Sequence, residues 1–186
     1  GTLHTELNAG DNLLVVQNNY LLDRMNGEFI SVLAVGEKVK QTSPVYIQEA
    51  SQKVKKNITL EFQRIKIESD EGHLYCMVLL DLLFSGAGSI GIDIHRALYI
   101  NFCMRNPSLK PGSIEFCKAI QVDEYYNCLK AKFGYAVTGH KCQGGEWEKV
   151  FVDFSGRTGM SNDCLRWAYT ATTRARETLF ITNLPH

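Results

Sequence analysis

The sequence lacks any long apolar run and any recognisable export signal. No stretch approaches the roughly 18 consecutive apolar residues that cross a bilayer as a helix. The opening segment, GTLHTELNAGD, has neither the basic start nor the apolar middle of a signal peptide. We therefore expect a cytoplasmic protein with no membrane partner.

Paired cysteines are also lacking. The cysteines are single and far apart, without the C-x-x-C pair or the nearby His pair of a zinc site. We therefore predict no metal site and reduced, mostly buried thiols. The six residues are Cys76, Cys103, Cys117, Cys128, Cys142 and Cys164.

The formal net charge is zero, so the chain as a whole does not attract nucleic acid. The charge is uneven, however, because basic residues outnumber acidic ones between Glu37 and Lys66. By itself this excess favours an ordinary solvated face over a surface that follows phosphates. With 186 residues, of which 45% are hydrophobic, the chain can bury the core of one domain and a subdomain.

Short β-like runs joined by turn residues fill the first part of the chain. Asn26 and Gly27 form a strong tight-turn dipeptide ahead of one run. Asn57–Ser69 alternates apolar and polar residues, and a break in phase near Gln63 indicates a bulge. Four such runs predict a small antiparallel β-barrel or curved sheet over residues 28–84.

After that region the apolar residues recur at helical steps of three and four. The pattern predicts helices over Asp93–Asn106, Ser113–Gly134 and Asn162–Glu177, and strands over 135–138, Glu148–Phe154 and 178–182. Ser113 is the expected N-cap of its helix, and Gly134 its stop. Continuous apolar strands alternating with helices are typical of a mainly parallel α/β sheet. We therefore predict an α/β domain formed by residues 1–27 and 85–186, with the barrel of residues 28–84 inserted.

The segment SGAGSIG, Ser85–Gly91, satisfies the dinucleotide-binding pattern G-x-G-x-x-G. The run before it belongs to a turn-linked antiparallel set, and no apolar strand ending in an acidic residue follows at the expected distance. We favour a flexible hinge between the insertion and the next helix. Dinucleotide binding is the less favoured alternative.

Two longer patterns lie near the C-terminal end. YAVTGHKCQGGEWEKVFVDF, residues 135–154, resembles motif V of superfamily 1 helicases of the RecD and Dda type. LRWAYTATTRARETLFI, residues 165–181, resembles motif VI of the same group. GDNLLVVQNNYLLDRMNGEF, residues 10–29, is similar to the segment that enters the Src-homology-3-like barrel inserted in the second motor domain of these helicases. The resemblance implies a second RecA-like motor domain, although residues 37–130 match in architecture more than in sequence.

The resemblance implies a catalytic role for Arg174. In such motors ATP lies between two RecA-like domains, and the domain without the phosphate loop supplies a cation to the γ-phosphate. Arg174 matches this arginine finger, and a guanidinium suits the task because it is always charged and presents a bidentate fork. Arg176 is expected on another face of the same helix, in a structural role.

The resemblance also divides motif V between two ligands. Thr138, His140 and Lys141 match positions that face single-stranded DNA, where their side chains can donate to phosphate oxygens without reading bases. The positions assigned to the nucleotide are Gln143, Gly144 and Glu146. Glycine allows close backbone approach, glutamate can bond the ribose or its surroundings, and glutamine is expected to couple the two ligands.

The 186 residues contain no G-x-x-x-x-G-K-[ST] phosphate loop and no Asp-Glu strand for magnesium after it. We therefore expect the C-terminal part of a monomeric, ATP-dependent DNA helicase. ATP and Mg²⁺ would be held together with an N-terminal RecA-like domain of the same protein, and this part alone would be inactive and hold no tight cofactor. The basic insertion is a candidate for guiding the strand. The alternative is a stand-alone nucleic-acid-binding or docking module without ATPase activity.

Overall fold

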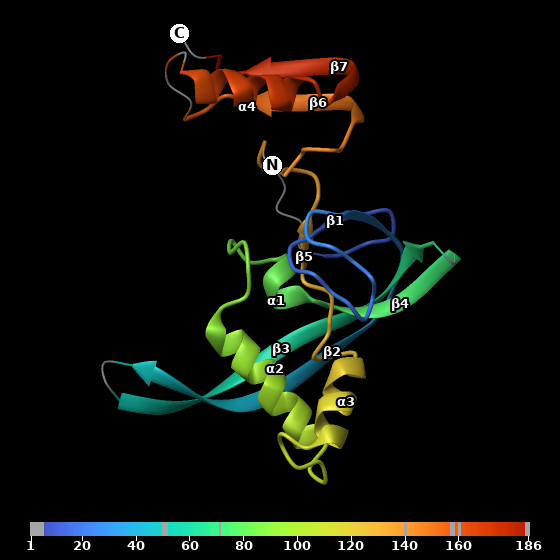
Figure 1. The fold of residues 1–186 in the computed structure, drawn as a ribbon, viewed down its shortest axis with the longest axis vertical. Helices are drawn as coiled ribbons and strands as arrows, with labels where there is room; N and C mark the ends of the chain where they lie inside the picture. The colour runs from blue at the N-terminus through green and yellow to red at the C-terminus, as the bar shows by residue number, and fades with distance from the viewer. Residues whose placement is uncertain are drawn as a thin grey trace. The chain divides into compact units, whose positions relative to one another are not determined.

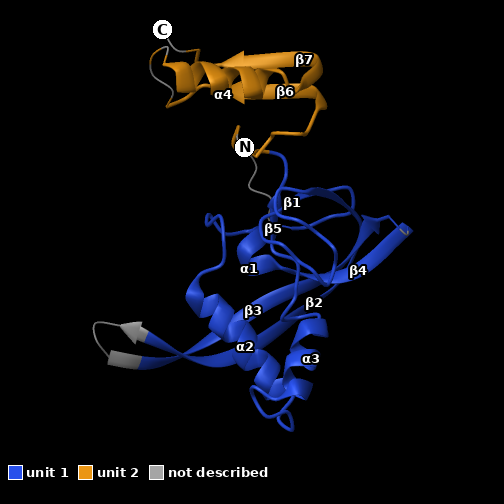
Figure 2. Cartoon of the chain, in the orientation of Figure 1, with its two compact units in different colours: residues 1–135 blue, residues 136–186 orange. Residues whose placement is uncertain are grey.

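The chain divides into two compact units, residues 1–135 and residues 136–186 (Figure 2). The structure is a computed structural model that describes residues 6–49, 52–70, 72–139, 141–156, 159 and 161–184. No helix in these ranges is long and apolar enough to cross a membrane.

The first unit is built on a five-stranded antiparallel sheet with the strand order β4-β3-β2-β1-β5 (Figure 1). Its described elements are β1 (Asn12–Val15), β2 (Phe29–Glu49), β3 (Gln52–Ser69), β4 (Gly72–Leu79), α1 (Leu80–Leu83), α2 (Ile92–Arg105), α3 (Ile114–Val122) and β5 (Ala131–Phe133). The helix predicted over Asp93–Asn106 is confirmed as α2, to within one residue at each end.

β2 and β3 form a long twisted hairpin (Figure 1). The predicted turn before β2 is confirmed, because Gly27 has a φ of 95°, which suits glycine, and the next residue's N–H closes the turn. The predicted bulge is also present. Val35 pairs with Ile65 and Lys38 pairs with Gln63, so the extra residue lies in β2, opposite the phase break seen in β3.

The sheet is not a closed barrel in the described part of the chain. The N–H of Leu129 donates to the carbonyl of Met77 at 2.7 Å, and the carbonyl of Leu129 accepts from the N–H of Leu79 at 3.1 Å. These bonds form one isolated bridge between Leu129, which precedes the edge strand β5, and β4, the edge strand at the other end of the sheet. The predicted barrel is therefore wrong in its closure, because a single bridge replaces a continuous ladder. The predicted boundaries at residues 28 and 84 stay a prediction.

α2 packs across one face of the β2–β3 hairpin (Figure 1). Val45, Leu60 and Phe62 of the hairpin are fully buried in one cluster with Ala97 and Leu98 of α2. Burying a side chain of this size contributes about 1.5–3 kcal/mol. This packing fixes which face of each hairpin strand is turned inward.

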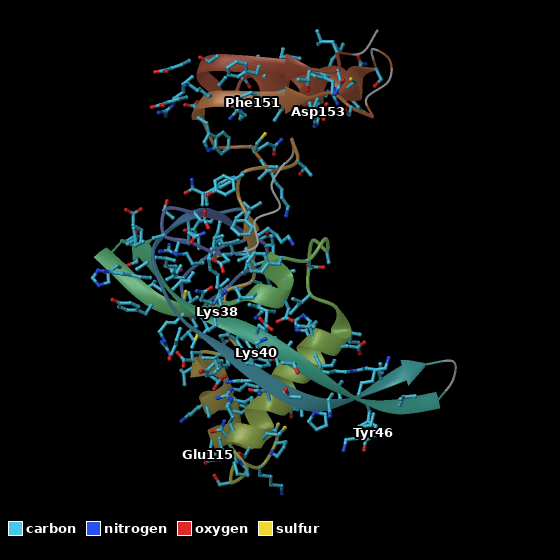
Figure 3. The ribbon with its side chains drawn as sticks, turned by 180° about the vertical axis from the view of Figure 1, so that it is seen from behind. Lys38, Lys40, Tyr46, Glu115, Phe151 and Asp153 are labelled. Carbon is cyan, nitrogen blue, oxygen red and sulfur yellow. The ribbon has the colours of Figure 1, made fainter. Side chains whose placement is uncertain are left out.

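The opposite face of the hairpin is polar and exposed. Because side chains alternate along a strand, Lys38, Lys40 and Tyr46 point away from the cluster that holds Val45. Figure 3 shows these three side chains along the hairpin, and Tyr46 is 60% exposed. Lys40 is paired with Glu61 of β3 at 2.5 Å.

α3 is much shorter than the helix predicted over Ser113–Gly134. Ser113 is confirmed as its N-cap, since the hydroxyl accepts a backbone N–H at 3.2 Å. The helix ends because the Asp123 carboxylate accepts two backbone N–H groups of the following turn, while the Asn127 amide donates to carbonyls at the helix end. The chain then enters β5, so Gly134 follows a strand and is not a helix stop.

The second unit is a parallel strand–helix–strand unit. Its described elements are β6 (Trp147–Asp153), α4 (Asn162–Thr172) and β7 (Ala175–Thr182). α4 covers one face of the two strands, where Val152 and Phe154 pack with Ala171. On the other face Phe151, which is 74% exposed, stacks on Phe180 with ring centroids 4.3 Å apart (Figure 3).

Several predictions for this region need correction. The strands predicted over Glu148–Phe154 and 178–182 are confirmed as β6 and β7, but residues 135–138 form no strand. α4 ends at Thr172, earlier than predicted. The predicted mainly parallel sheet is also wrong, because parallel pairing in the described ranges is limited to β6 and β7, apart from one isolated bridge. β1 falls in the domain predicted to hold that sheet, but it pairs antiparallel with both of its neighbours, β2 and β5.

The cysteines agree with the prediction, since all six are free and most are buried. The buried ones are Cys76, Cys128, Cys142 and Cys164. Burial raises the pKa of the Cys76 thiol to about 12 and that of the Cys128 thiol to about 11, so both stay neutral at physiological pH.

SGAGSIG connects α1 to α2, and the strand before α1 is antiparallel to its neighbour. The dinucleotide alternative therefore lacks its strand–turn–helix context.

Candidate nucleotide and nucleic-acid site

The first part of the predicted motif V is a compact turn. The backbone N–H groups of Lys141 and Cys142 both donate to the carbonyl of Thr138, at 2.9 and 3.2 Å. We name this segment the 138–142 turn. Thr138 and Lys141 are both exposed on it, so two of the three side chains predicted to face DNA share one turn. The third, His140, lies outside the described residues.

The 138–142 turn rests on helix α4. A Cβ atom built on Gly139 would lie 2.7 Å from Cδ1 of Trp167, too close for any side chain. The Cys142 thiol is buried and donates to the Gly139 carbonyl at 2.9 Å. Sequence reasoning missed Trp167, because an aromatic residue on a helix indicates core packing and carries no signal of a loop partner.

The second part of motif V leads from the turn to β6. Gln143 and Gly144 are exposed, and no atom lies within 4 Å of a Cβ built on Gly144. The φ of Gly144 is 85°, a conformation that favours glycine. A ligand could therefore approach the backbone here without meeting a side chain, which suits the nucleotide-binding role predicted for this position.

Arg174 lies in the short connection between α4 and β7. Its Nε donates to the carbonyl of Thr170 at 3.0 Å, its Nη1 to the carbonyl of Gly145 at 3.2 Å, and its Nη2 to the hydroxyl of Thr173 at 3.0 Å. Its own carbonyl accepts the backbone N–H of Trp147 at 2.9 Å. The side chain and the backbone of Arg174 thus join the two predicted motifs.

Glu146 forms an ion pair with Arg176. Nε of Arg176 donates to a carboxylate oxygen of Glu146 at 3.0 Å, and the Glu146 and Arg176 side chains are 53% and 65% exposed. The expected position of Arg176 is wrong, because the residue lies on β7 and not on the helix. Sequence reasoning missed this partner of Glu146, because the predicted helix continued past Thr172 and included Arg176.

The site therefore has two parts within one unit. The first part holds the ion pair of Glu146 with Arg176 and the bonds of Arg174 to the backbone of residues 145 and 147. The second part is the 138–142 turn, which carries Thr138 and Lys141. The two parts are linked by the N–H of Gly145, which donates to the Cys142 carbonyl at 3.2 Å.

The side chains fit a phosphate better than a metal ion. A guanidinium has five N–H donors, and the three hydrogen bonds that Arg174 makes to described residues occupy one donor on each nitrogen, so two remain for an anion. In contrast, no group of three His, Cys, Asp or Glu side chains in the described ranges could hold a metal. The one carboxylate in this part of the site, Glu146, is paired with a cation.

Residues 133–182 match the profile of the UvrD-like helicase C-terminal domain family. The matched segment runs from the last residue of β5 to the last residue of β7 and contains every predicted site residue. This family is typical of helicases, and the match suggests part of a superfamily 1 helicase. No curated protein matches the chain.

Proposed function

We propose that this chain is the part of an ATP-dependent DNA helicase that supplies the arginine finger and contacts to single-stranded DNA. In this proposal it forms the second RecA-like motor domain of a RecD-like or Dda-like protein. The observation that carries the proposal is the position of Arg174, whose guanidinium bonds both the end of α4 and the loop of the other predicted motif.

Arg174 would act on the γ-phosphate of ATP. The guanidinium is oriented by three neutral oxygen acceptors, and among the described residues no carboxylate pairs with it and two of its N–H groups donate no hydrogen bond. A cation in this form stabilises the negative charge that develops during phosphoryl transfer. Gly144 and Glu146 would lie against the nucleotide, with Gln143 between the two ligands.

Thr138, His140 and Lys141 would hold the DNA strand. A hydroxyl, an imidazole and an ammonium can each donate to phosphate oxygens, and such contacts bind the backbone without reading the bases. The 138–142 turn continues directly into the loop that bonds Arg174. ATP and the DNA strand would therefore both contact this one short segment. Domain closure on ATP and release after hydrolysis would then move the strand.

The remaining parts of the proposal concern partners. A phosphate-loop domain of the same protein would bind the rest of ATP together with Mg²⁺, since neither a phosphate loop nor a magnesium-binding strand occurs in these 186 residues. The protein would work as a monomer in the cytoplasm, on single-stranded DNA.

The test is the ATPase activity of the natural full-length protein with and without single-stranded DNA. Arg174→Ala should lower the DNA-stimulated rate by about 10³–10⁵, the usual loss on removing an arginine finger. The affinity for an oligothymidylate should change by less than about twofold, because Arg174 lies outside the predicted DNA contacts.

Arg166→Ala is the matched control, since Arg166 is an exposed arginine of α4, the helix that precedes Arg174. It should retain the DNA-stimulated rate. An unchanged rate in Arg174→Ala would refute the finger assignment. A wild-type protein that binds single-stranded DNA but hydrolyses no ATP would instead favour the stand-alone binding module.

A further inference from the structure

Trp167 and Gly139 form a matched pair between helix α4 and the 138–142 turn. The three atoms nearest to a Cβ built on Gly139 all belong to the indole of Trp167, including Cδ1 at 2.7 Å and Cε2 at 2.9 Å. The backbone of the turn therefore lies directly on the indole. Only glycine allows this approach, since any side chain would overlap the ring.

Close approach is the reason for glycine at this position. Gly139 does not have the positive φ that Gly144 has, so its backbone conformation is open to other residues. The constraint comes from the indole. A residue without the indole at position 167 would remove the constraint at position 139.

The indole is itself held in place. The ring of Trp167 meets the ring of Phe154 edge-on, with centroids 5.2 Å apart and an interplanar angle of 84°. Trp167 also packs against the core formed by β6 and α4. A rotamer change is therefore resisted by well-packed neighbours, and the indole is a fixed platform for the turn.

Helix α4 and the residues directly after it thus contact the motif V segment at two points. Trp167 supports the turn at Gly139, and Arg174, seven residues later, bonds the same segment at the carbonyl of Gly145. If Arg174 turned to a phosphate and released Gly145, the contact at Trp167 would remain.

We propose that Trp167 is a positioning residue that holds the 138–142 turn in register with α4, and so links Arg174 to the strand-contacting side chains Thr138 and Lys141. This inference rests on the proposed function, because it assumes that Arg174 meets ATP and that the turn meets DNA. It assigns to the Gly139–Trp167 contact a role that neither residue's type predicts.

The experiment is a double-mutant cycle in the natural full-length protein, with Gly139→Ala, Trp167→Leu and the combined variant. The quantity measured is the concentration of oligothymidylate that gives half-maximal stimulation of ATP hydrolysis. Gly139→Ala should raise this concentration roughly threefold or more, which corresponds to the lower end of the coupling energies between residues in contact. In the Trp167→Leu background the same alanine should have no further effect, since the space of the indole is then open. Leu165→Ala, an exposed apolar residue of α4, is the control.

A second readout does not depend on ATP. Amide hydrogen exchange reports the bonds from the N–H groups of Lys141 and Cys142 to the Thr138 carbonyl. Gly139→Ala should speed exchange at both amides, and adding Trp167→Leu should cancel the effect of the alanine. Equal exchange in the wild type and Gly139→Ala would overturn the packing on which the inference depends.

The outcomes separate the inference from the proposed function. If Arg174→Ala abolishes DNA-stimulated hydrolysis but Gly139→Ala behaves as the wild type, the inference is wrong and the function stands. If the alanine acts equally strongly in both backgrounds, the inference is also wrong, because the effect does not pass through the indole. If the wild type shows no DNA-stimulated hydrolysis, both fail.

Discussion

Arg174 bonds neutral oxygens, whereas Arg176 bonds a carboxylate. This difference matters, since a carboxylate partner would compete with phosphate for the guanidinium charge. The carbonyls of Thr170 and Gly145 and the hydroxyl of Thr173 orient Arg174 without neutralising it. At the scale of single residues, the geometry thus separates the proposed finger from its neighbour in the sequence.

Glu146 allows a test of the same kind. Its ion pair with Arg176 is exposed, and such pairs contribute about 0–1 kcal/mol to the free energy of unfolding. Glu146→Ala should therefore change that free energy by less than about 1 kcal/mol. It should raise the KM for ATP about fivefold or more, because a hydrogen bond to the ribose would be removed.

Urea unfolding and steady-state ATPase kinetics measure the two quantities. Glu148→Ala, a neighbouring exposed carboxylate, should leave both unchanged. An unchanged KM in Glu146→Ala would remove this residue from the nucleotide site. A decrease of several kcal/mol in the free energy of unfolding would instead identify Glu146 as a structural residue.

The sequence marks these residues as candidates but does not predict their neighbours. The resemblance to motifs V and VI singles out Glu146 and Arg174, and their roles stay predictions. The pairing of Glu146 with Arg176 depends on the chain leaving the helix after Thr172 and starting β7 at Ala175. The pairing of Ala175 with Trp147 of β6 overrides the helical pattern of residues 173–177. No signal in the local sequence predicts this pairing.

Among the elements, the β2–β3 hairpin has the clearest division of faces. One face is buried under α2, and the other carries Lys38, Lys40, Tyr46 and Lys55. Lys40 is compensated by Glu61, whereas the structure gives no ion pair for Lys38 or Lys55 among the described residues. The basic excess seen in the sequence is therefore placed partly on an exposed strand face, where it could follow a phosphate backbone.

This face gives a prediction that salt dependence can test. Lys38→Gln with Lys55→Gln should reduce the slope of log affinity against log salt by about 1.4 for single-stranded DNA, or about 0.7 for each phosphate that is no longer neutralised. Lys110→Gln with Lys118→Gln removes the same charge from positions outside the hairpin and should leave the slope unchanged. Equal slopes for both pairs would identify the hairpin face as an ordinary solvated surface.

The elements also mark where sequence patterns fail. α2, β6 and the N-cap at Ser113 follow from local periodicity and capping. The early end of α3 does not, because it depends on Asp123 and Asn127 satisfying backbone groups that a continuing helix would satisfy itself. The sequence could not decide between the predicted β-barrel and the curved sheet either, since closure depends on how many residues near Leu129 pair with β4.

In the whole molecule, the proposed nucleotide and DNA contacts lie in the second unit, and the basic hairpin face lies in the first. The match to the UvrD-like helicase C-terminal domain family covers residues 133–182, so it bears on the second unit and the residues that lead into it. The first unit has an antiparallel sheet with its own core, and its proposed role depends on the charge of one hairpin face. The proposed contact with ATP therefore lies in the second unit, at Arg174 and the loop that it bonds.

Trapping of a transition-state mimic tests that claim most directly. ADP with aluminium fluoride imitates the phosphoryl group in transfer, and an arginine finger stabilises this form more than the ground state. With single-stranded DNA present, the wild-type full-length protein should retain labelled ADP through gel filtration when aluminium fluoride is added. Arg174→Ala should still bind ADP with an affinity within about twofold of the wild type, but should not form the trapped complex. Trapping by Arg174→Ala equal to that of the wild type would contradict the account.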